Sequence, residues 1–239
     1  MKIVNKYVYP SSSRANISGL RHYTIDGTEE KLPSVTTVIG QTQPKEKQES
    51  LDRWRQRVGL REAQKITRDA AIRGTAMHKY LEDEILGQRS LDLTPLGVEA
   101  TNMAKIIMER GLNDCSEIYG TEATLYYPGL YAGSVDLVAK YQDKVSIIDF
   151  KQTNKPKQRE WIEDYFLQMA AYGMAHDVVH GTAIEQGVIM MCSKDGYYQQ
   201  FMIEGEEFRE AKHKFLGRLD EYNSCMGNNS NAVVAGSTE

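Results

Sequence analysis

The spacing of hydrophobic residues changes near residue 111, from a helical period to segments of alternation. Up to residue 111, apolar side chains recur three or four positions apart, as in LREAQKITRDAAIRGTAMHKYLEDEILG, which predicts a long helix that ends at Gly87. The same spacing predicts helices over about 45–58 and 95–110. Beyond residue 111 apolar and polar residues alternate, which is typical of half-buried strands.

The second half of the chain predicts strands interrupted by helices. The predicted strands cover residues 117–127, 130–141, 144–151, 183–193 and 196–204. The predicted helices cover about 159–179 and 206–223. This order favours an α/β fold, in which helices flank a central mixed sheet of about five strands and an N-terminal helical part precedes the sheet.

The two ends of the chain lack this regularity. Residues 1–33 predict an irregular segment with a small hairpin at Asp26-Gly27, and Ser34 then offers an N-cap to a short helix closed by Gly40. Residues 224–239 are small and polar, and we expect this tail to be disordered.

Composition indicates a globular chain with no membrane partner. Of 239 residues 41% are hydrophobic, which suits one sizeable domain, and no apolar run approaches the roughly 18 residues that a membrane span needs. The N-terminus MKIVNKYVYPSSS lacks the apolar segment of a secretory signal. Three scattered cysteines favour a reducing compartment over a disulfide framework or a zinc knuckle. We therefore expect a cytoplasmic protein.

Charge is distributed unevenly along the chain. The net charge of -4 does not support nucleic-acid binding by the molecule as a whole. Residues 45–73, however, hold nine Lys or Arg against five Asp or Glu, and residues 151–159 hold four cations and no acid. This pattern is compatible with a basic groove on one side only.

Two carboxylates on neighbouring strands are the first candidate for chemistry. Asp136 and Asp149 lie on either side of one tight hairpin, so their side chains can meet on one face of the sheet. Such a pair repels unless a cation lies between its members, and Mg²⁺ or Mn²⁺ is the natural one. Lys151 shares the strand face of Asp149 and could orient or deprotonate a metal-bound water. The alternative is an ordinary charged strand end.

The segment RGTAMHKYLEDE adds a second candidate, because His78 and Glu82 are four residues apart and share one helix face. His78 offers a ring nitrogen to a metal, although a lone histidine is more often structural. His176 and His180 are also four apart, but nothing near them indicates a site, and we interpret them as structural.

Several motifs in a fixed order carry a resemblance to a known family. They comprise Gly74, His78, the GxxD motif ending in Asp136, Asp149, Phe150, Lys151, Gln168 and Tyr172. This set resembles the RecB-like branch of the PD-(D/E)XK nucleases. Within that branch, the chain resembles the mitochondrial genome maintenance exonuclease family over roughly residues 32–191. The segments that carry this closer resemblance are LPSVTTVIGQT, LDRWRQR, SVDLVAKYQDKVSIIDFKQTNKPK and LQMAAY.

The resemblance implies a restriction-endonuclease-like core and a metal-dependent DNA nuclease, most of all an exonuclease that digests single strands in replication, repair or recombination. His78, Asp136, Asp149 and the Phe150 carbonyl would hold Mg²⁺ or Mn²⁺, and Lys151 would be the catalytic lysine. A single nuclease domain would span 34–223, with 34–111 as a helical wall and 112–223 as the catalytic core.

Two further positions follow from the family pattern, and one departs from it. Gln168 and Tyr172, one helical turn apart, match the family's extra motif and would support the site or contact DNA. Many RecB-like members have threonine directly after the lysine, whereas Gln152 here precedes Thr153. The role of Thr153 is therefore open.

Hydroxyl groups at the start of the short helix could contact the DNA backbone. Ser34, Thr36 and Thr37 offer such groups, while plain N-capping by Ser34 is an equal alternative. Trp54, between Arg53 and Arg57, could stack on a base as the arginines follow phosphates, but its helical spacing favours a core residue.

Other cations offer further phosphate contacts. Arg73 beside Gly74 could reach a phosphate near the metal, and Lys155 and Lys157 could line the path of the strand. Exposed lysines more often simply face solvent.

Two other functions compete with the exonuclease. They are a non-catalytic module that binds DNA ends and a structure-specific endonuclease. Three cysteines are too few for a four-cysteine iron–sulfur cluster. The short chain favours a bacterial or bacteriophage protein, in the bacterial or infected-host cytoplasm, over a mitochondrial one. No local motif encodes the cleavage polarity or the oligomeric state.

Overall fold

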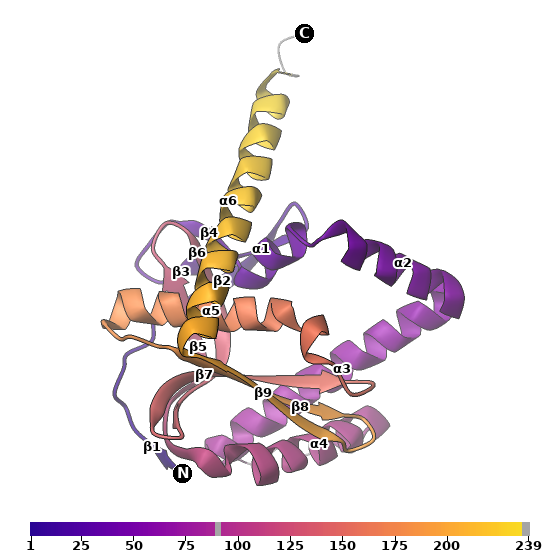
Figure 1. Cartoon of the computed structure of the whole chain (residues 1–239), viewed down its shortest axis with the longest axis vertical. Coiled ribbons are helices and arrows are strands. Elements are labelled where there is room, and N and C mark those ends of the chain that lie inside the picture. Colours follow the sequence, from indigo (N-terminus) through magenta and orange to yellow (C-terminus); the bar gives the residue numbers. More distant parts are fainter. Residues whose placement is uncertain (89–91, 236–239) are drawn as a thin grey trace.

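The computed structural model describes residues 1–88 and 92–235 (Figure 1). A mixed six-stranded sheet in the order β1-β5-β6-β7-β8-β9 forms its centre. The strands are β1 (Lys2–Ile3), β5 (Cys115–Tyr127), β6 (Tyr131–Tyr141), β7 (Lys144–Thr153), β8 (Gln186–Ser193) and β9 (Tyr198–Glu204). The predicted α/β fold is confirmed, and the additional strand is β1, which pairs parallel to β5.

The length of each connection determines whether the strands that it joins run antiparallel or parallel. Tight turns join β5, β6 and β7 into an antiparallel meander, and another joins β8 to β9. β7 and β8 are parallel, so the chain must cross over between them, and α5 (Glu163–His180) makes this crossover. Every residue of β8 is buried, as expected for a central strand.

Helices cover both faces of the sheet with separate hydrophobic layers (Figure 1). On one face, α3 (Leu60–Ile85) and α4 (Pro95–Gly111) bury Met77 and Ile107 against Phe150. On the other face, α5 and α6 (Gly205–Ala235) pack residues such as Phe208 against Ile189. Each buried side chain of this size contributes about 1.5–3 kcal/mol.

The N-terminal segment forms a small three-stranded sheet where the sequence predicted an irregular segment with one small hairpin. It comprises β2 (Ser12–Ile17), β3 (Leu20–Ile25) and β4 (Lys31–Pro33) in antiparallel order. The predicted hairpin at Asp26-Gly27 is confirmed, because β3 and β4 pair antiparallel on either side of it. A second, two-residue turn at Ser18-Gly19, both with positive φ, joins β2 to β3. The sheet is stable because Tyr23 and its neighbours bury against Ala132 of β6.

The helices before the main sheet start as predicted. Ser34 caps α1 (Val35–Gln41), and α2 (Lys45–Val58) passes into α3 through Gly59, which has a φ of 87°. α2 extends away from the sheet and has no buried residue (Figure 1). The interpretation of Trp54 as a core residue is therefore wrong: the side chain is only half-buried, because no second layer encloses α2.

The last helix is longer than the sequence predicted. α6 continues past residue 223 to Ala235, into the tail expected to be disordered, and residues 236–239 lie outside the described part of the chain. The added segment contains no proline, and extending a helix that has already started costs little free energy. In the described part of the chain, no helix combines the length and apolar character that a membrane span requires.

His176 and His180 belong to an aromatic cluster with Tyr7 and Tyr9, in which His176 is fully buried, and this packing supports their structural interpretation. The His176 ring lies 4.6 Å from the Tyr7 ring, its Nδ1 lies 2.8 Å from Thr182 Oγ1 and its Nε2 lies 3.2 Å from Tyr9 Oη. Burial, helped by the charges of His180 and Lys6, lowers the pKa of His176 to about 3.

This buried histidine predicts loss of stability in mild acid. Below a pH of about 6.5 the unfolded chain binds a proton at His176 that the folded chain binds only near its lowered pKa of about 3, so the free energy of unfolding falls as the pH falls. Between pH 8 and 5 the wild type should lose about 2 kcal/mol more than His176→Gln in urea unfolding. The exposed His213→Gln serves as control, and equal losses in wild type and His176→Gln would contradict the prediction.

Candidate functional site

The sheet divides between β6 and β7, and the candidate site lies at the division. The two strands pair as far as Leu137 opposite Ile148, beyond which β6 stays with β5 and β7 stays with β8. The next position of this register places Asp136 opposite Asp149. Since β6 no longer pairs with β7 at this point, the Phe150 N–H donates instead to the side-chain oxygen Oδ2 of Asp136, at 2.7 Å. The two predicted carboxylates therefore meet where the ladder opens.

A third carboxylate, Glu122 on β5, extends the row across three strands. The pairs on either side of Glu122 place it opposite Asp136. Its φ of 45° is unusual for a residue within a strand and follows a register shift earlier in β5. Ser134 Oγ donates to Glu122 Oε2 at 2.9 Å and orients the carboxylate. Such local strain is characteristic of functional sites.

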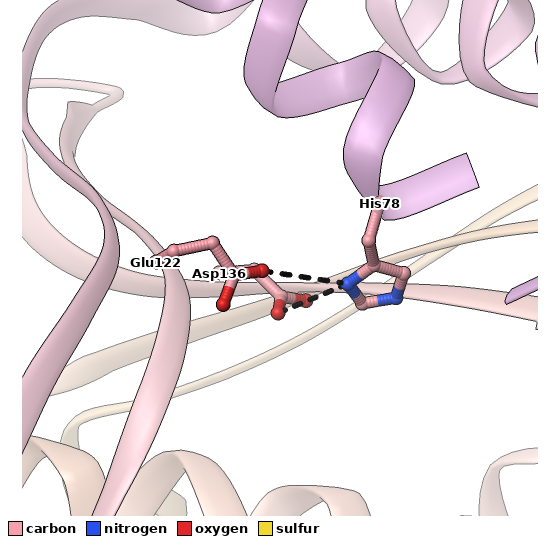
Figure 2. Close-up of side chains that lie close together, drawn as sticks. All are labelled: His78, Glu122 and Asp136. Carbon is pink, nitrogen blue, oxygen red and sulfur yellow. Dashed lines mark ion pairs between the residues drawn. The ribbon is translucent and has the colours of Figure 1, made fainter. Parts of the chain in front are cut away.

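His78 reaches the row from α3 (Figure 2), and the layer of α3 lies on the opposite face of the sheet from α5. Its Nδ1 lies 3.2 Å from Asp136 Oδ1 and 4.0 Å from Glu122 Oε1. These three residues each offer a ligand atom within 4.8 Å of the others. They form a candidate metal-binding triad, in which Glu122 is a member that was not predicted from the sequence.

The charges within this triad are strongly coupled. Burial lowers the pKa of His78, but the charge of Asp136 and its hydrogen bond outweigh burial and raise the pKa to about 9. Burial raises the pKa of Asp136, but the charge of His78 outweighs it and the pKa is lowered. The proton on His78 thus supplies the positive charge that the carboxylates need when no cation is bound.

Lys151 and Asp149 form a buried ion pair beside the triad. Lys151 Nζ also lies 5.0 Å from the centre of the Tyr165 ring. Gln168 Nε2 lies 3.5 Å from Asp149 Oδ1 and 3.2 Å from Tyr172 Oη. Gln168 of α5 therefore contacts one carboxylate oxygen of Asp149, and Lys151 contacts the other. Burial raises the pKa of Asp149 to about 6, although the charge of Lys151 opposes this rise.

A cavity of about 450 Å³ brings most of the predicted residues together. Those that line it are Ser34, Thr36, Gly74, His78, Glu82, Asp136, Asp149, Lys151, Gln168 and Tyr172. The other predicted side chains do not line it: Thr37, Arg53, Trp54, Arg57, Arg73, Thr153, Lys155 and Lys157. The cavity is also lined by residues that are not among the predicted site residues: Arg14, Arg21, Tyr23, Thr75, Lys79, Glu122, Gly133 and Ser134.

Gly133, the first residue of the GxxD motif, gives Tyr172 its place in the cavity. A Cβ atom at Gly133 would lie 2.7 Å from Tyr172 Cε1 and 2.9 Å from its hydroxyl. Any larger residue at this position would displace the tyrosine ring and break the hydrogen bond that Gln168 donates to its hydroxyl. The glycine of the GxxD motif therefore indicates, already in the sequence, a position where another side chain must approach the strand closely.

The hydroxyls before and within α1 are engaged within the protein. Ser34 Oγ accepts from the Thr37 N–H at 3.0 Å, which confirms the N-cap. Thr37 Oγ1 donates to the Arg21 carbonyl at 3.1 Å. Thr36 Oγ1 lies 3.0 Å from Ser34 Oγ. Of the three, only Ser34 and Thr36 line the cavity.

Arg73 is buried and links three elements instead of lining the cavity. Its guanidinium donates to Gln152 Oε1 at 3.1 Å, to Glu99 Oε2 at 3.0 Å and to Asn154 Oδ1. Gln152 thus has a defined role on the face of β7 opposite Lys151. The phosphate contact of Arg73 remains a prediction.

The cations beyond β7 and on α2 lie apart from the cavity. Thr153 Oγ1 donates to the Lys155 carbonyl at 2.7 Å and stabilises the turn after β7. The Lys157 N–H donates to Gln199 Oε1 at 2.7 Å, which ties this loop to β9. On α2, Arg53 pairs with Glu49 at 3.6 Å on an exposed surface.

Comparison with known proteins shows what the chain resembles. No family model matches it. It is 31% identical over 203 residues to mitochondrial genome maintenance exonuclease 1 of Homo sapiens, covering 80% of this chain and 58% of the relative. The Xenopus tropicalis protein of the same name is 32% identical over 215 residues, covering 84% and 59%. The resemblance inferred from the motifs is confirmed, and the chain spans about 58–60% of the length of these relatives.

A solved structure also resembles the chain. A candidate exonuclease of Eubacterium rectale has a TM-score of 0.46 and 14% identity, covering 65% of this chain and 68% of that one. At this TM-score the likeness adds nothing to the topology described above.

The carboxylate row predicts a gain in stability on neutralising one member. Burial and the charge of Asp136 raise the pKa of Glu122, so its charge is unfavourable in the folded protein. In EDTA, Glu122→Gln should raise the free energy of unfolding by about 1 kcal/mol, since glutamine keeps the acceptor for Ser134. In Mn²⁺ the wild type should gain more thermal stability than the variant.

Glu117→Gln on the same strand, away from the row, is the matched control. A destabilised Glu122→Gln in EDTA, or an undiminished response to Mn²⁺, would contradict the role assigned to Glu122.

Arg73 predicts a stability defect of its own. Arg73→Lys keeps the charge but cannot reproduce three hydrogen bonds at once, and it should lower the free energy of unfolding by about 2–3 kcal/mol. Urea unfolding measures this decrease against Arg68→Lys on the exposed side of the same helix. Unchanged stability together with weakened DNA binding would instead favour the phosphate contact.

Proposed function

We propose that this chain is a divalent-metal-dependent DNA nuclease that digests single strands from an end. The observation that carries the proposal is the row of Glu122, Asp136 and Asp149 across three strands, with His78 and Lys151 beside it on one cavity. The name of the relatives, mitochondrial genome maintenance exonuclease 1, supports DNA as the substrate and the exonuclease mode.

The donors of the site fit Mg²⁺ or Mn²⁺. His78, Glu122 and Asp136 would hold the ion, with Asp149 and the Phe150 carbonyl as the further ligands that the family pattern implies. Asp149 Oδ2 is buried and paired with the Lys151 ammonium group, and a carboxylate oxygen so paired still has lone pairs for a cation. Carboxylate oxygens with one imidazole suit these ions. When bound, the ion polarises the phosphate and lowers the pKa of a bound water.

Lys151 is the residue placed to act on the phosphate. Asp149 and the Tyr165 ring hold its ammonium group at the cavity, so the group needs little reorganisation when a substrate binds. There it orients the attacking water and stabilises the negative charge that develops on the phosphate oxygens. Gln168 and Tyr172 are positioning residues, since they act through Asp149.

The rest of the substrate lies beyond the metal ligands. Ser34 and Thr36 line the same cavity, and the Thr36 hydroxyl would turn from Ser34 Oγ to donate a hydrogen bond to a phosphate oxygen. The Ser34 hydroxyl proton is donated to Thr37 Oγ1, so Ser34 would hold the start of α1 in place. The exposed helix α2 carries Arg53, Trp54 and Arg57, which would follow the strand farther from the cleaved bond.

The direct test is cleavage of labelled DNA. Linear single strands, linear duplexes and circular single strands are incubated with Mg²⁺, Mn²⁺ or EDTA. Wild type should degrade linear single strands only with metal and should leave circles intact. Asp149→Asn and Lys151→Met should each lower the single-turnover rate at least about a thousandfold, because both act on the transition state.

Asp143→Asn and Lys144→Met, in the turn at the other end of the same strand pair, are the matched controls and should retain full activity. Metal-dependent cutting of circles would indicate an endonuclease. Binding of DNA ends without cleavage under any metal would indicate a non-catalytic module and overturn the proposal.

A further inference from the structure

Two arginines of the small N-terminal sheet lie on the wall of the nuclease cavity. On β2, Arg14 lies opposite Tyr23 of β3, and Arg21 precedes Tyr23 by two residues. Opposite residues and residues two apart share a face, so all three side chains belong to the same side of this sheet. All three line the cavity that also holds Asp136 and Asp149.

These arginines are the cations of the cavity that lack an anionic partner. Within the described residues, neither the Arg14 nor the Arg21 guanidinium makes an ion pair or a hydrogen bond; Arg14 instead lies 5.4 Å from the centre of the Tyr23 ring. The other cations are engaged, Lys151 by Asp149 and Lys79 by a carboxylate on its own helix. Both arginines are exposed at the cavity and remain available to an anion.

The backbone that carries Arg21 is held firmly against the main sheet. The Arg21 carbonyl accepts from the Ser34 N–H at 3.0 Å and from Thr37 Oγ1 at 3.1 Å. On β2, Ser12 Oγ lies 2.9 Å from Thr124 Oγ1 of β5. A phosphate held by these arginines would therefore be placed at a set distance from the carboxylate row.

A second cavity continues from the first at Arg14. It measures about 690 Å³ and shares Arg14, Glu122 and Ser134 with the nuclease cavity. Hydroxyl groups such as that of Ser12 line it, and Arg14 is the one cation among its described lining residues. A strand that passes from one cavity into the other must bring a backbone phosphate past Arg14.

We propose that Arg14 and Arg21 form a phosphate-binding subsite that holds the phosphate next to the one hydrolysed. The inference rests on the proposed nuclease function and adds a positioning role to the N-terminal sheet. The planar guanidinium presents paired donors that match phosphate oxygens. The subsite directs the strand from the carboxylate row into the second cavity and so sets which bond lies at the metal ligands.

The test replaces one charged linkage of the substrate at a time. The substrates are short oligothymidylates in which each linkage in turn is replaced by an uncharged methylphosphonate, and their cleavage is measured under multiple-turnover conditions. For wild type, neutralising the linkage next to the cleaved one should lower kcat/KM about tenfold. In the double variant Arg14→Gln/Arg21→Gln, kcat/KM for the all-phosphate substrate should fall by the same factor, mainly through a higher KM. The methylphosphonate should then cause no further decrease in kcat/KM.

A binding measurement without catalysis separates this inference from the proposed function. In EDTA, the affinity of the double variant for fluorescent oligothymidylate should depend less steeply on salt, by about 0.7 in logarithmic slope for each phosphate that the arginines no longer neutralise. Lys31→Gln is the control, because Lys31 lies opposite Thr24 and hence on the other face of the same sheet.

Equal methylphosphonate penalties in wild type and the double variant, or an unchanged salt slope, would overturn the subsite while leaving the nuclease intact. Absence of cleavage by wild type with a reduced salt slope in the variant would overturn the nuclease function and retain an anion-binding site.

Discussion

Electrostatic repulsion between neighbouring carboxylates is the constraint around which the site is built. Glu122, Asp136 and Asp149 lie in one row across three strands, and each is at least partly removed from water. Like charges so close together are unfavourable unless positive charge balances them. The chain supplies that balance through His78 and Lys151, and the two hydrophobic layers supply the stability that lets the strained arrangement persist.

The division of the sheet makes this balance possible. A continuous sheet would separate His78, which comes from the layer of α3, from Gln168 and Tyr172, which come from α5 on the other face. Where β6 and β7 part, side chains from both layers reach the same carboxylates. The glycine at position 133 removes the remaining obstacle by leaving room for Tyr172.

The N-terminal segment turns this opening into a walled cavity. Its three strands bury few residues, but hydrogen bonds and the contact with Ala132 attach them beside β6. The attachment places Arg14 and Arg21 on the cavity that the carboxylates also line. A cavity that combines acidic ligands with unpaired guanidinium groups suits a cation and a substrate whose backbone is an anion.

The sequence by itself determined the helices and strands from α2 to β9 and the meeting of Asp136 with Asp149, because these depend on periodicity and on one tight hairpin. Only the tertiary structure decided that Glu122 joins the site, since a register shift and a positive φ set its direction. It also decided that α2 projects and that Arg73 bonds to Gln152, Glu99 and Asn154 on two other elements. The physical reason is that periodicity is local, whereas contacts between distant segments depend on register, bulges and the packing of layers.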